Sequence, residues 1–384
     1  MAKTDTALDL QSRLTEEFPP TWRDAAARVP RHAFLPNRFW LEDGDGPVPV
    51  DRAEEPGRWL ELSYADRPIV TQLDDGDGSG RGYITSSASQ PSIVGQMLEA
   101  AAPAAGDRVL EIGTGTGWNA ALLAARVGAE NVVTVEIDKS LAEQARHSLS
   151  EQGWPVEVVT GDGTRGWPAG APYDRVLSTA AVQRVPFAWV EQTRPEGRIV
   201  TPWGTTFHNG VLAELTVTDD GTATGSFGGN TAFMWVRDQR RPHAVVEDLV
   251  LEQHEFHTST TGLHPYEPIG SFDASFGIGL RLAPGISPVL VFDDDQEGNP
   301  YYTVYLLAPE SGSWASWRIE PGMREYPLRQ HGPRRLFDEL ADAYSWWTGL
   351  GSPDYTRFGL TVDHQGQQVW LDAPDRPVSS RVLS

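Results

Sequence analysis

Between Gly106 and Gly204 the sequence alternates short apolar runs with longer segments of helical character, and this alternation restricts the fold more than any other feature. The apolar runs are RVLEI, NVVTVEID, VEVVTGD and YDRVLSTAA, with RIVTPWG as a candidate fifth. The segments WNAALLAARVG and KSLAEQARHSLSEQG separate the first three runs. Strands that alternate with helices at this spacing predict a parallel sheet with helices on its faces. Ligands of such sheets bind beyond the carboxyl ends of the strands, near the point where the strand order reverses.

A glycine-rich turn follows the first of these strands, in the stretch VLEIGTGTGWNAALLA at residues 109–124. The spacing Gly113-x-Gly115-x-Gly117 is tighter than the G-x-G-x-x-G pattern of dinucleotide-binding proteins. Glu111 stands two positions before the first glycine, and its carboxylate would repel a pyrophosphate at the start of the next helix. The turn therefore favours a ligand that carries positively charged groups. The alternative is that the glycines only allow close packing of helix and strand and that the acids are solvated.

Two further acids stand at the ends of the next strands. Glu136 ends the second strand, where an acid can accept a hydrogen bond from a ribose 2′-hydroxyl. Asp162 lies in the GDG that ends the third strand, and it can accept from an exocyclic amine such as that of adenine. With Glu111, the glycines, Thr114 and Gly163, these residues predict a site for S-adenosylmethionine.

The chain resembles the protein L-isoaspartate O-methyltransferases over roughly residues 10–210. The motifs that carry the resemblance stand in the order VPRHAF (29–34), YADRPI (64–69), SASQPSIV (87–94), the glycine turn, TVEID, GDG and STAAVQRVP (178–186). The resemblance implies a Rossmann-like α/β fold and methyl transfer from S-adenosylmethionine to a peptide carboxylate. It also implies that Ser89 is the active-site serine and that Glu111, Gly113, Glu136 and Asp162 are cofactor positions.

The implied reaction demands little from side chains, because a carboxylate is already a nucleophile at neutral pH and the leaving group is a neutral thioether. Catalysis then consists mainly of orientation. The hydroxyl of Ser89 can hold one carboxylate oxygen while the other attacks, and Thr85, Ser86 and Ser87 are expected to contact the substrate. The alternative for each serine is a cap or turn role before the following helix, which for Ser86 and Ser87 is the favoured interpretation.

This chain departs from the family in two places. A Gly/Asp-rich loop intervenes at residues 71–82, and Ser87 replaces the family's threonine, so the generic substrate is in doubt. The chain also continues well beyond the family's usual end. We expect a catalytic domain at residues 1–235 and a smaller α+β accessory domain at residues 236–384, after the basic linker RDQRRPH (237–243).

The extension contains three features with a functional and a structural interpretation. His254, His257 and His264 could hold a metal, but we favour strand or loop positions and predict no metal site. DDDQEG at 293–298 mimics the start of a calcium loop, but the bidentate Glu is missing and we predict a hairpin turn. The five tryptophans are equally compatible with a small core and with a peptide-docking surface, and they are Trp314, Trp317, Trp346, Trp347 and Trp370.

An extension of this kind resembles that of actinobacterial enzymes that tailor ribosomal peptides such as graspetides, lasso peptides and lanthipeptides. The resemblance implies esterification of one Asp of a macrocyclic peptide, followed by closure to an aspartimide and hydrolysis to isoaspartate. The alternatives are a general isoaspartate repair methyltransferase and a non-enzymatic peptide-binding protein. The chain has no cysteine, a net charge of −22 and no segment typical of a signal peptide or a membrane span. We therefore expect a cytoplasmic protein with a peptide partner and with neither nucleic acid nor membrane as partner.

Overall fold

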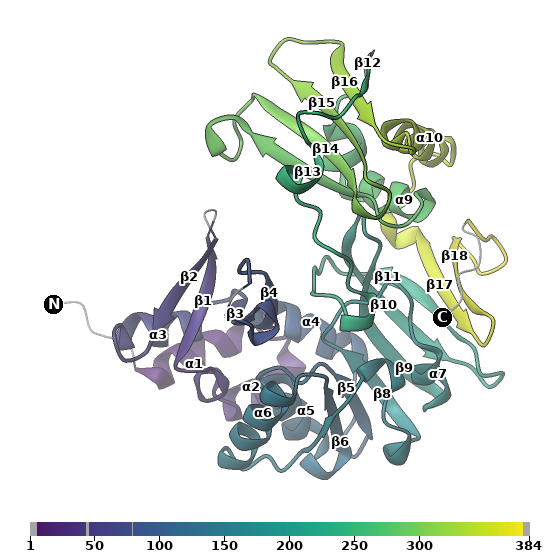
Figure 1. Cartoon of the computed structure of the whole chain (residues 1–384). Helices are drawn as coiled ribbons and strands as arrows, with labels where there is room; N and C mark the ends of the chain where they lie inside the picture. Colours follow the sequence, from purple (N-terminus) through teal and green to yellow (C-terminus); the bar gives the residue numbers. More distant parts are fainter. Residues whose placement is uncertain (1–5, 44–45, 79, 379–384) are drawn as a thin grey trace.

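The computed structural model of the protein describes residues 6–43, 46–78 and 80–378, and a nine-stranded sheet dominates this part of the chain (Figure 1). Its strand order is β18-β17-β11-β10-β9-β8-β5-β6-β7. The five strands predicted from the alternation pair in parallel, and the other four are antiparallel. The strands are β5 (Val109–Ile112), β6 (Val132–Glu136), β7 (Glu157–Thr160), β8 (Tyr173–Ser178), β9 (Thr193–Gly204), β10 (Asn209–Val217), β11 (Ala223–Gly228), β17 (Phe358–Asp363) and β18 (Gly366–Leu371).

The parallel strands are apolar on both faces because helices or other elements cover both. Neighbouring residues of a strand point to opposite sides, and Val109 and Leu177 join one apolar cluster whereas Leu110 and Val176 join the other. The first cluster includes residues of α1, α2, α4, α5 and α6, and the second includes residues of α7 and of the C-terminal helices. These helices are α1 (Ala7–Glu16), α2 (Arg23–Arg28), α4 (Pro91–Ala101), α5 (Trp118–Val127), α6 (Lys139–Glu151) and α7 (Phe187–Glu191).

The N-terminal segment adds a small sheet beside the main one. The helical region at its start breaks at Pro19-Pro20, since neither α1 nor α2 includes these prolines. The four strands then pair in the order β2-β1-β3-β4, and α3 (Pro56–Ser63) lies between β2 and β3 in the sequence. These strands are β1 (Arg38–Asp43), β2 (Gly46–Asp51), β3 (Ile69–Leu73) and β4 (Ile84–Ala88).

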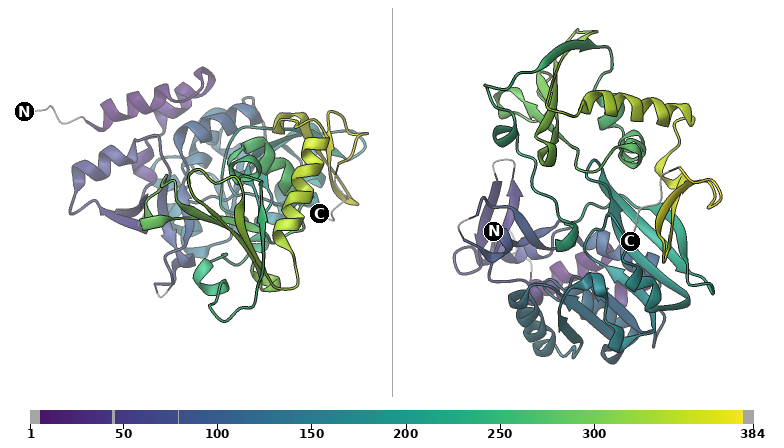
Figure 2. Two further views of the ribbon diagram at one scale, coloured as in Figure 1. Left: turned by 90° about the horizontal axis from the view of Figure 1, so that it is seen from above. Right: turned by 45° about the vertical axis from the view of Figure 1, so that its right-hand side comes forward.

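The extension forms a second, antiparallel sheet, with the order β12-β16-β15-β14-β13. Helix α10 packs on β14 and β15, and α9 packs on α10, so the predicted α+β character is confirmed (Figure 2). Residues 293–301 connect β13 and β14 as a hairpin, and Asp293 pairs with Arg318 at 2.5 Å. The elements are α8 (Val246–Leu249), β12 (His257–Thr261), α9 (Phe272–Arg281), β13 (Ser287–Phe292), β14 (Tyr302–Ala308), β15 (Ser313–Ile319), β16 (Tyr326–His331) and α10 (Leu336–Gly349).

The last hairpin, β17–β18, does not belong to this second sheet. It lies within the accessory domain expected at residues 236–384, but β17 pairs with β11 of the nine-stranded sheet. A buried glutamine fixes this position, because Gln367 accepts from the Val185 amide at 2.9 Å and donates to the Gln183 carbonyl at 2.7 Å. The chain therefore leaves the first sheet, builds the second one and returns (Figure 1). A domain boundary at residues 235/236 stays a proposal. If the boundary lies there, the hairpin β17–β18 still belongs to the first domain, because β17 pairs with β11.

The tryptophans of the extension mainly build cores. Trp314, Trp317, Trp347 and Trp370 are each at most 9% exposed, so they offer little surface to a partner. His254 accepts a hydrogen bond from the Trp314 indole, and within the described residues no three His, Asp or Glu side chains gather in a way that could hold a metal ion. In the same part of the chain, no helix combines the length and apolar character needed to cross a bilayer.

Candidate active site

The glycine turn lies where the strand order reverses, since β5 sits between β6 and β8. Gly113, Gly115 and Gly117 have φ of +90°, +53° and +86°, which favour glycine. A Cβ at Gly113 would lie 2.8 Å from the hydroxyl oxygen of Thr179, which itself donates to the Gly113 carbonyl at 2.6 Å. A Cβ at Gly117 would come within 3.2 Å of Leu149 on α6. The glycines thus serve both the turn itself and close packing around it.

Glu111 lies behind the turn rather than in the pocket in front of it. Its exposed fraction is 0%, and it accepts hydrogen bonds from Asn119 at 2.6 Å and from Thr134 at 2.5 Å. Burial raises the pKa of Glu111 to about 7. This geometry corrects the expectation that Glu111 touches the cofactor directly, because a carboxylate without accessible surface cannot meet a ligand. Glu111 instead holds the side chain of Asn119, and Asn119 does line the pocket.

Glu136 ends β6 and does line the pocket. Its two oxygens accept from the Gly115 amide at 2.9 Å and from the Asp138 amide at 3.0 Å, so each retains a further lone pair for a ligand hydroxyl. Burial raises the pKa of Glu136, and these two amides oppose that rise. Next to it, Ile137 is 41% exposed in the pocket, and an exposed apolar side chain there suits one face of a flat base. The sequence analysis did not identify Ile137.

Asp162 begins the short turn after β7 and lines the same pocket. One of its oxygens accepts from the Thr164 amide and hydroxyl at 3.0 and 2.7 Å. The other oxygen makes a 3.7 Å contact with Arg165. Gly163 brings the backbone close to β5, because a Cβ there would lie 2.5 Å from the Ile112 side chain. Thr114 is buried and shares a 2.7 Å hydrogen bond with Thr134, which steadies the turn.

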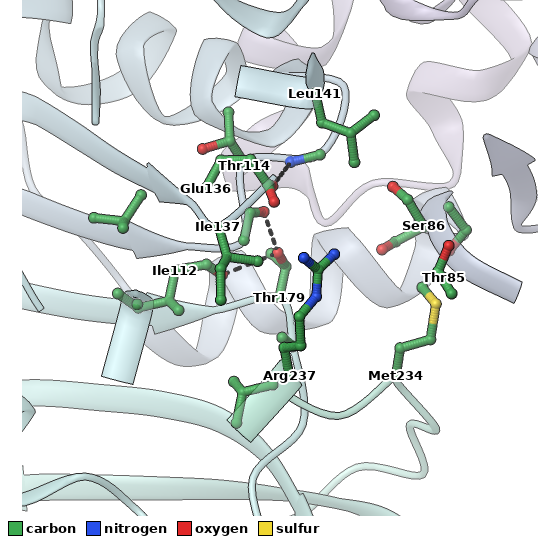
Figure 3. A pocket seen from close by; sticks show the side chains of 18 of the residues that line it. Thr85, Ser86, Ile112, Thr114, Glu136, Ile137, Leu141, Thr179, Met234 and Arg237 are labelled. Carbon is green, nitrogen blue, oxygen red and sulfur yellow. Dashed lines mark hydrogen bonds between the residues drawn. The ribbon is translucent and has the colours of Figure 1, made fainter. Parts of the chain in front are cut away.

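The hydroxyl side chains form the facing wall of the same pocket (Figure 3). Thr85, Ser86 and Ser87 lie in β4, so the favoured cap or turn role of the two serines is wrong: the segment is an extended strand. Ser86 accepts from Thr71 at 3.1 Å across the sheet. Ser89 follows the strand and also lines the pocket, and it does not cap α4, whose N-cap is Gln90 without a side-chain bond. The sequence-predicted cofactor and substrate residues other than Glu111 and Gly117 thus line one cavity.

A buried arginine in the VPRHAF motif holds this serine segment in place. Arg31 is fully buried and donates to five carbonyl groups, including those of Ala88 and Ser89 at 3.2 and 3.0 Å. Burial lowers the pKa of Arg31, although an arginine stays charged under ordinary conditions. The sequence analysis quoted the motif but did not identify this role. The motif is the only local signal of it, since the bonds join residues far apart in the chain.

The linker to the extension forms a further wall that the sequence analysis missed. Met234, Trp235, Val236, Arg237 and Arg240 all line the pocket, and Figure 3 shows the Arg237 side chain rising from the linker into it. The empty space, including the open mouth, is about 1060 Å³.

The residues present fit S-adenosylmethionine better than a dinucleotide. The cavity has the carboxylates of Glu136 and Asp162 at strand ends, an exposed Ile137, and a glycine turn whose backbone a side chain would obstruct. Carboxylates suit the hydroxyls of a ribose and the cationic centres of the methyl donor, whereas they repel a pyrophosphate. The fold and this site together define a Rossmann-like, S-adenosylmethionine-dependent methyltransferase.

Comparison with known proteins narrows the class. Residues 50–241 match the family model of protein-L-isoaspartate(D-aspartate) O-methyltransferase. The protein-L-isoaspartate O-methyltransferase of Gloeobacter violaceus is 38% identical over 198 residues, which cover 51% of this chain and 80% of that relative. The Methanopyrus kandleri enzyme of the same name is 36% identical over 55% of this chain and 80% of its own. The chain belongs to the protein-L-isoaspartate O-methyltransferase family and is a protein carboxyl O-methyltransferase.

A solved structure titled protein-L-isoaspartate O-methyltransferase shares the fold, with a TM-score of 0.55 and 21% identity. The superposition covers 96% of this chain and 100% of the other. The similarity of fold therefore continues beyond residue 241, where the family match ends.

Proposed function

We propose that this enzyme methylates the free carboxylate of isoaspartyl residues in peptides and proteins. The observation that carries the proposal is one pocket lined both by Glu136, Asp162 and the glycine turn and by Ser86, Ser87 and Ser89. The names of the relatives support the same substrate class. The roles of the individual residues are part of this proposal.

The expected chemistry rests on positioning. When bound, S-adenosylmethionine supplies a methyl group activated by a positively charged sulfur. Glu136 would hold the ribose hydroxyls and Asp162 the base, which fixes the direction in which the methyl group points. Ser89 donates a hydrogen bond to one oxygen of the acceptor carboxylate and leaves the other free to attack, and Arg31 keeps the Ser89 backbone in place. No general base is required, so the rate comes chiefly from orientation at near-attack distance.

The second candidate is esterification of a normal Asp in one macrocyclic ribosomal peptide. The next backbone amide nitrogen would then attack the ester carbonyl and release methanol as the aspartimide closes. The feature that favours this candidate is the loop at residues 71–82, whose Asp75 and Arg81 form ion pairs with the linker and with α8. Such an arrangement could restrict the substrates, because specificity often comes from excluding wrong partners. We further propose that the second sheet, together with α9 and α10, forms the accessory unit of the enzyme and docks the peptide substrate.

A substrate panel separates the two candidates. Short isoaspartyl peptides of unrelated sequence, the same peptides with normal Asp, and macrocyclic peptides encoded near the gene would each be incubated with enzyme and S-adenosylmethionine. Mass spectrometry would follow the gain of one CH₂. Turnover of every isoaspartyl peptide, and of none with normal Asp, supports the first candidate. Turnover confined to a normal Asp of one macrocycle, followed by loss of methanol, supports the second and refutes the first.

A further inference from the structure

We propose that Arg237 and Arg240 form the site at which the substrate's carboxylate group first binds when it enters the pocket, before Ser89 orients it, and that Asp75 occupies this site in the absence of substrate. The inference rests on the proposed function, because it assigns the residues that select a carboxylate-bearing peptide. It concerns a part of the chain that neither the glycine turn nor the serine motif includes.

The two arginines converge on a single carboxylate. Arg237 donates to one oxygen of Asp75 at 2.9 Å, and Arg240 donates to the other oxygen at 2.8 Å. Two guanidinium groups on two carboxylate oxygens make a strong and directional arrangement for an anion. Both arginines also line the pocket that contains Ser86, Ser87 and Ser89. A substrate carboxylate that enters the pocket therefore meets a site shaped for it and already filled by a side chain.

The hydrogen bonds of Arg237 are not all satisfied by the carboxylates around it. Its Nε atom is buried and has no hydrogen-bond partner, so the bond to Asp75 does not complete the pairing of this guanidinium group. The nearest other carboxylate is that of Asp138, at 3.7 Å, and Asp138 also accepts from Gln72 at 3.2 Å. The three side chains of the Asp75 cluster are 27–39% exposed, so an exchange of carboxylates does not require opening a core.

A tight turn with an unusual backbone conformation places Asp75 against the two arginines. Its φ is +54°, a conformation that Asp and Asn tolerate better than other non-glycine residues. Its amide donates to the Thr85 hydroxyl at 2.9 Å, which ties the turn to the strand that carries the serines. Movement of the Asp75 carboxylate away from the arginines would therefore disturb the hydrogen bond between this turn and Thr85 in β4.

The linker also contacts the loop in a way that does not involve Asp75. The rings of Tyr83 and His243 stack with their centroids 3.7 Å apart and their planes 6° from parallel. The arginine pair is therefore held over the pocket whichever carboxylate it binds.

The test compares two labelled peptides on four proteins. One fluorescein-labelled, C-terminally amidated peptide carries a single isoaspartyl residue as the sole carboxylate of its peptide part, and the other carries Asn in its place with the same label. Fluorescence anisotropy gives the affinity with S-adenosylhomocysteine present. The proteins are the wild type, Asp75→Asn, Arg240→Gln and the control Asp248→Asn, which breaks an ion pair of the same loop that does not touch the arginine pair.

Asp75→Asn keeps the turn conformation and removes the competing charge, so it should tighten binding of the isoaspartyl peptide roughly two- to fivefold. Arg240→Gln should weaken that binding by a similar factor. Binding of the Asn peptide should not change in either variant, and Asp248→Asn should leave both peptides unaffected. Equal changes for both peptides, no change in Asp75→Asn, or the same gain in Asp248→Asn would overturn the proposal.

Failure of this inference and failure of the proposed function give different results. If the wild type methylates the isoaspartyl peptide and the KM is the same in Asp75→Asn and Arg240→Gln, the arginine site is refuted and the function stands. If the arginine pair selects the isoaspartyl peptide but no methyl group is transferred, the proposed function is refuted and the site stands.

Discussion

Replacement of Glu111 by Gln should stabilise the protein at alkaline pH and lose this advantage at acidic pH. The wild-type carboxylate has an exposed fraction of 0% and accepts from Asn119 and Thr134. The amide of Gln has nearly the same shape and carries no charge. Its new NH₂ group can find an acceptor, because the side-chain oxygen of Asn119 is buried without a hydrogen-bond partner.

The size and sign follow from protonation. The pKa of Glu111 is raised to about 7 in the folded chain from an ordinary value of 4.5. Between these values the folded chain binds a proton that the unfolded chain releases, so stability falls as the pH rises from 4.5 to 7 and stays low above 7. Over this pH range the free energy of unfolding of the wild type falls by about 3 kcal/mol. Glu111→Gln does not have this loss, so its stability relative to the wild type should increase as the pH rises from 4.5 to 7.

Thermal unfolding of both proteins from pH 5 to pH 8 checks this prediction. With an unfolding entropy of roughly 0.8 kcal/mol/K for a chain of this length, a gain of about 3 kcal/mol raises the Tm by about 4 °C at pH 8, provided the chain unfolds in one transition. The matched control is Glu157→Gln, an exposed glutamate on β7, which should shift the Tm little at any pH. Parallel profiles for the wild type and Glu111→Gln would refute the reasoning.

Three further changes test other parts of the site. Glu136→Gln should weaken binding of S-adenosylhomocysteine by about 1–3 kcal/mol in calorimetry, since ligand hydroxyls lose a charged acceptor; unchanged affinity would remove Glu136 from the ribose site. Ser89→Ala should lower kcat by up to about a hundredfold with cofactor affinity nearly intact, and equal loss of both would point to a structural role. Arg31→Met should cost at least about 3 kcal/mol in urea unfolding, because five carbonyl groups lose a charged donor, and a stability within error of the wild type would contradict that role.

The parallel part of the main sheet could be predicted because its information is local. Each strand from β5 to β8 is a short apolar run, and each glycine with positive φ marks a turn or a helix end. Pairing partners are not local. Nothing in the sequence of residues 358–371 indicates that β17 joins β11, which precedes it by more than a hundred residues.

The candidate site likewise contains residues that the local sequence indicates and contacts that it does not. Glu136, Asp162 and the glycines follow predicted strands, so their meeting at one sheet edge could be inferred. The burial of Glu111 could not, because facing the pocket and facing Asn119 have the same sequence pattern. The contact of Asp75 with Arg237 joins residues 162 positions apart, and it depends on how the linker crosses the pocket. Acidic and basic stretches in a sequence do not indicate which of them will pair.

Methyl transfer by the purified enzyme tests the central claim most directly. The measurement would follow tritium from methyl-labelled S-adenosylmethionine into an isoaspartyl peptide, with the wild type and Ser89→Ala side by side and the Asn peptide as blank. The account predicts label in the isoaspartyl peptide that alkali releases as methanol, because the product is a methyl ester, and much slower labelling by Ser89→Ala. Label that resists alkali, equal labelling of the Asn peptide, or no label at all would contradict it.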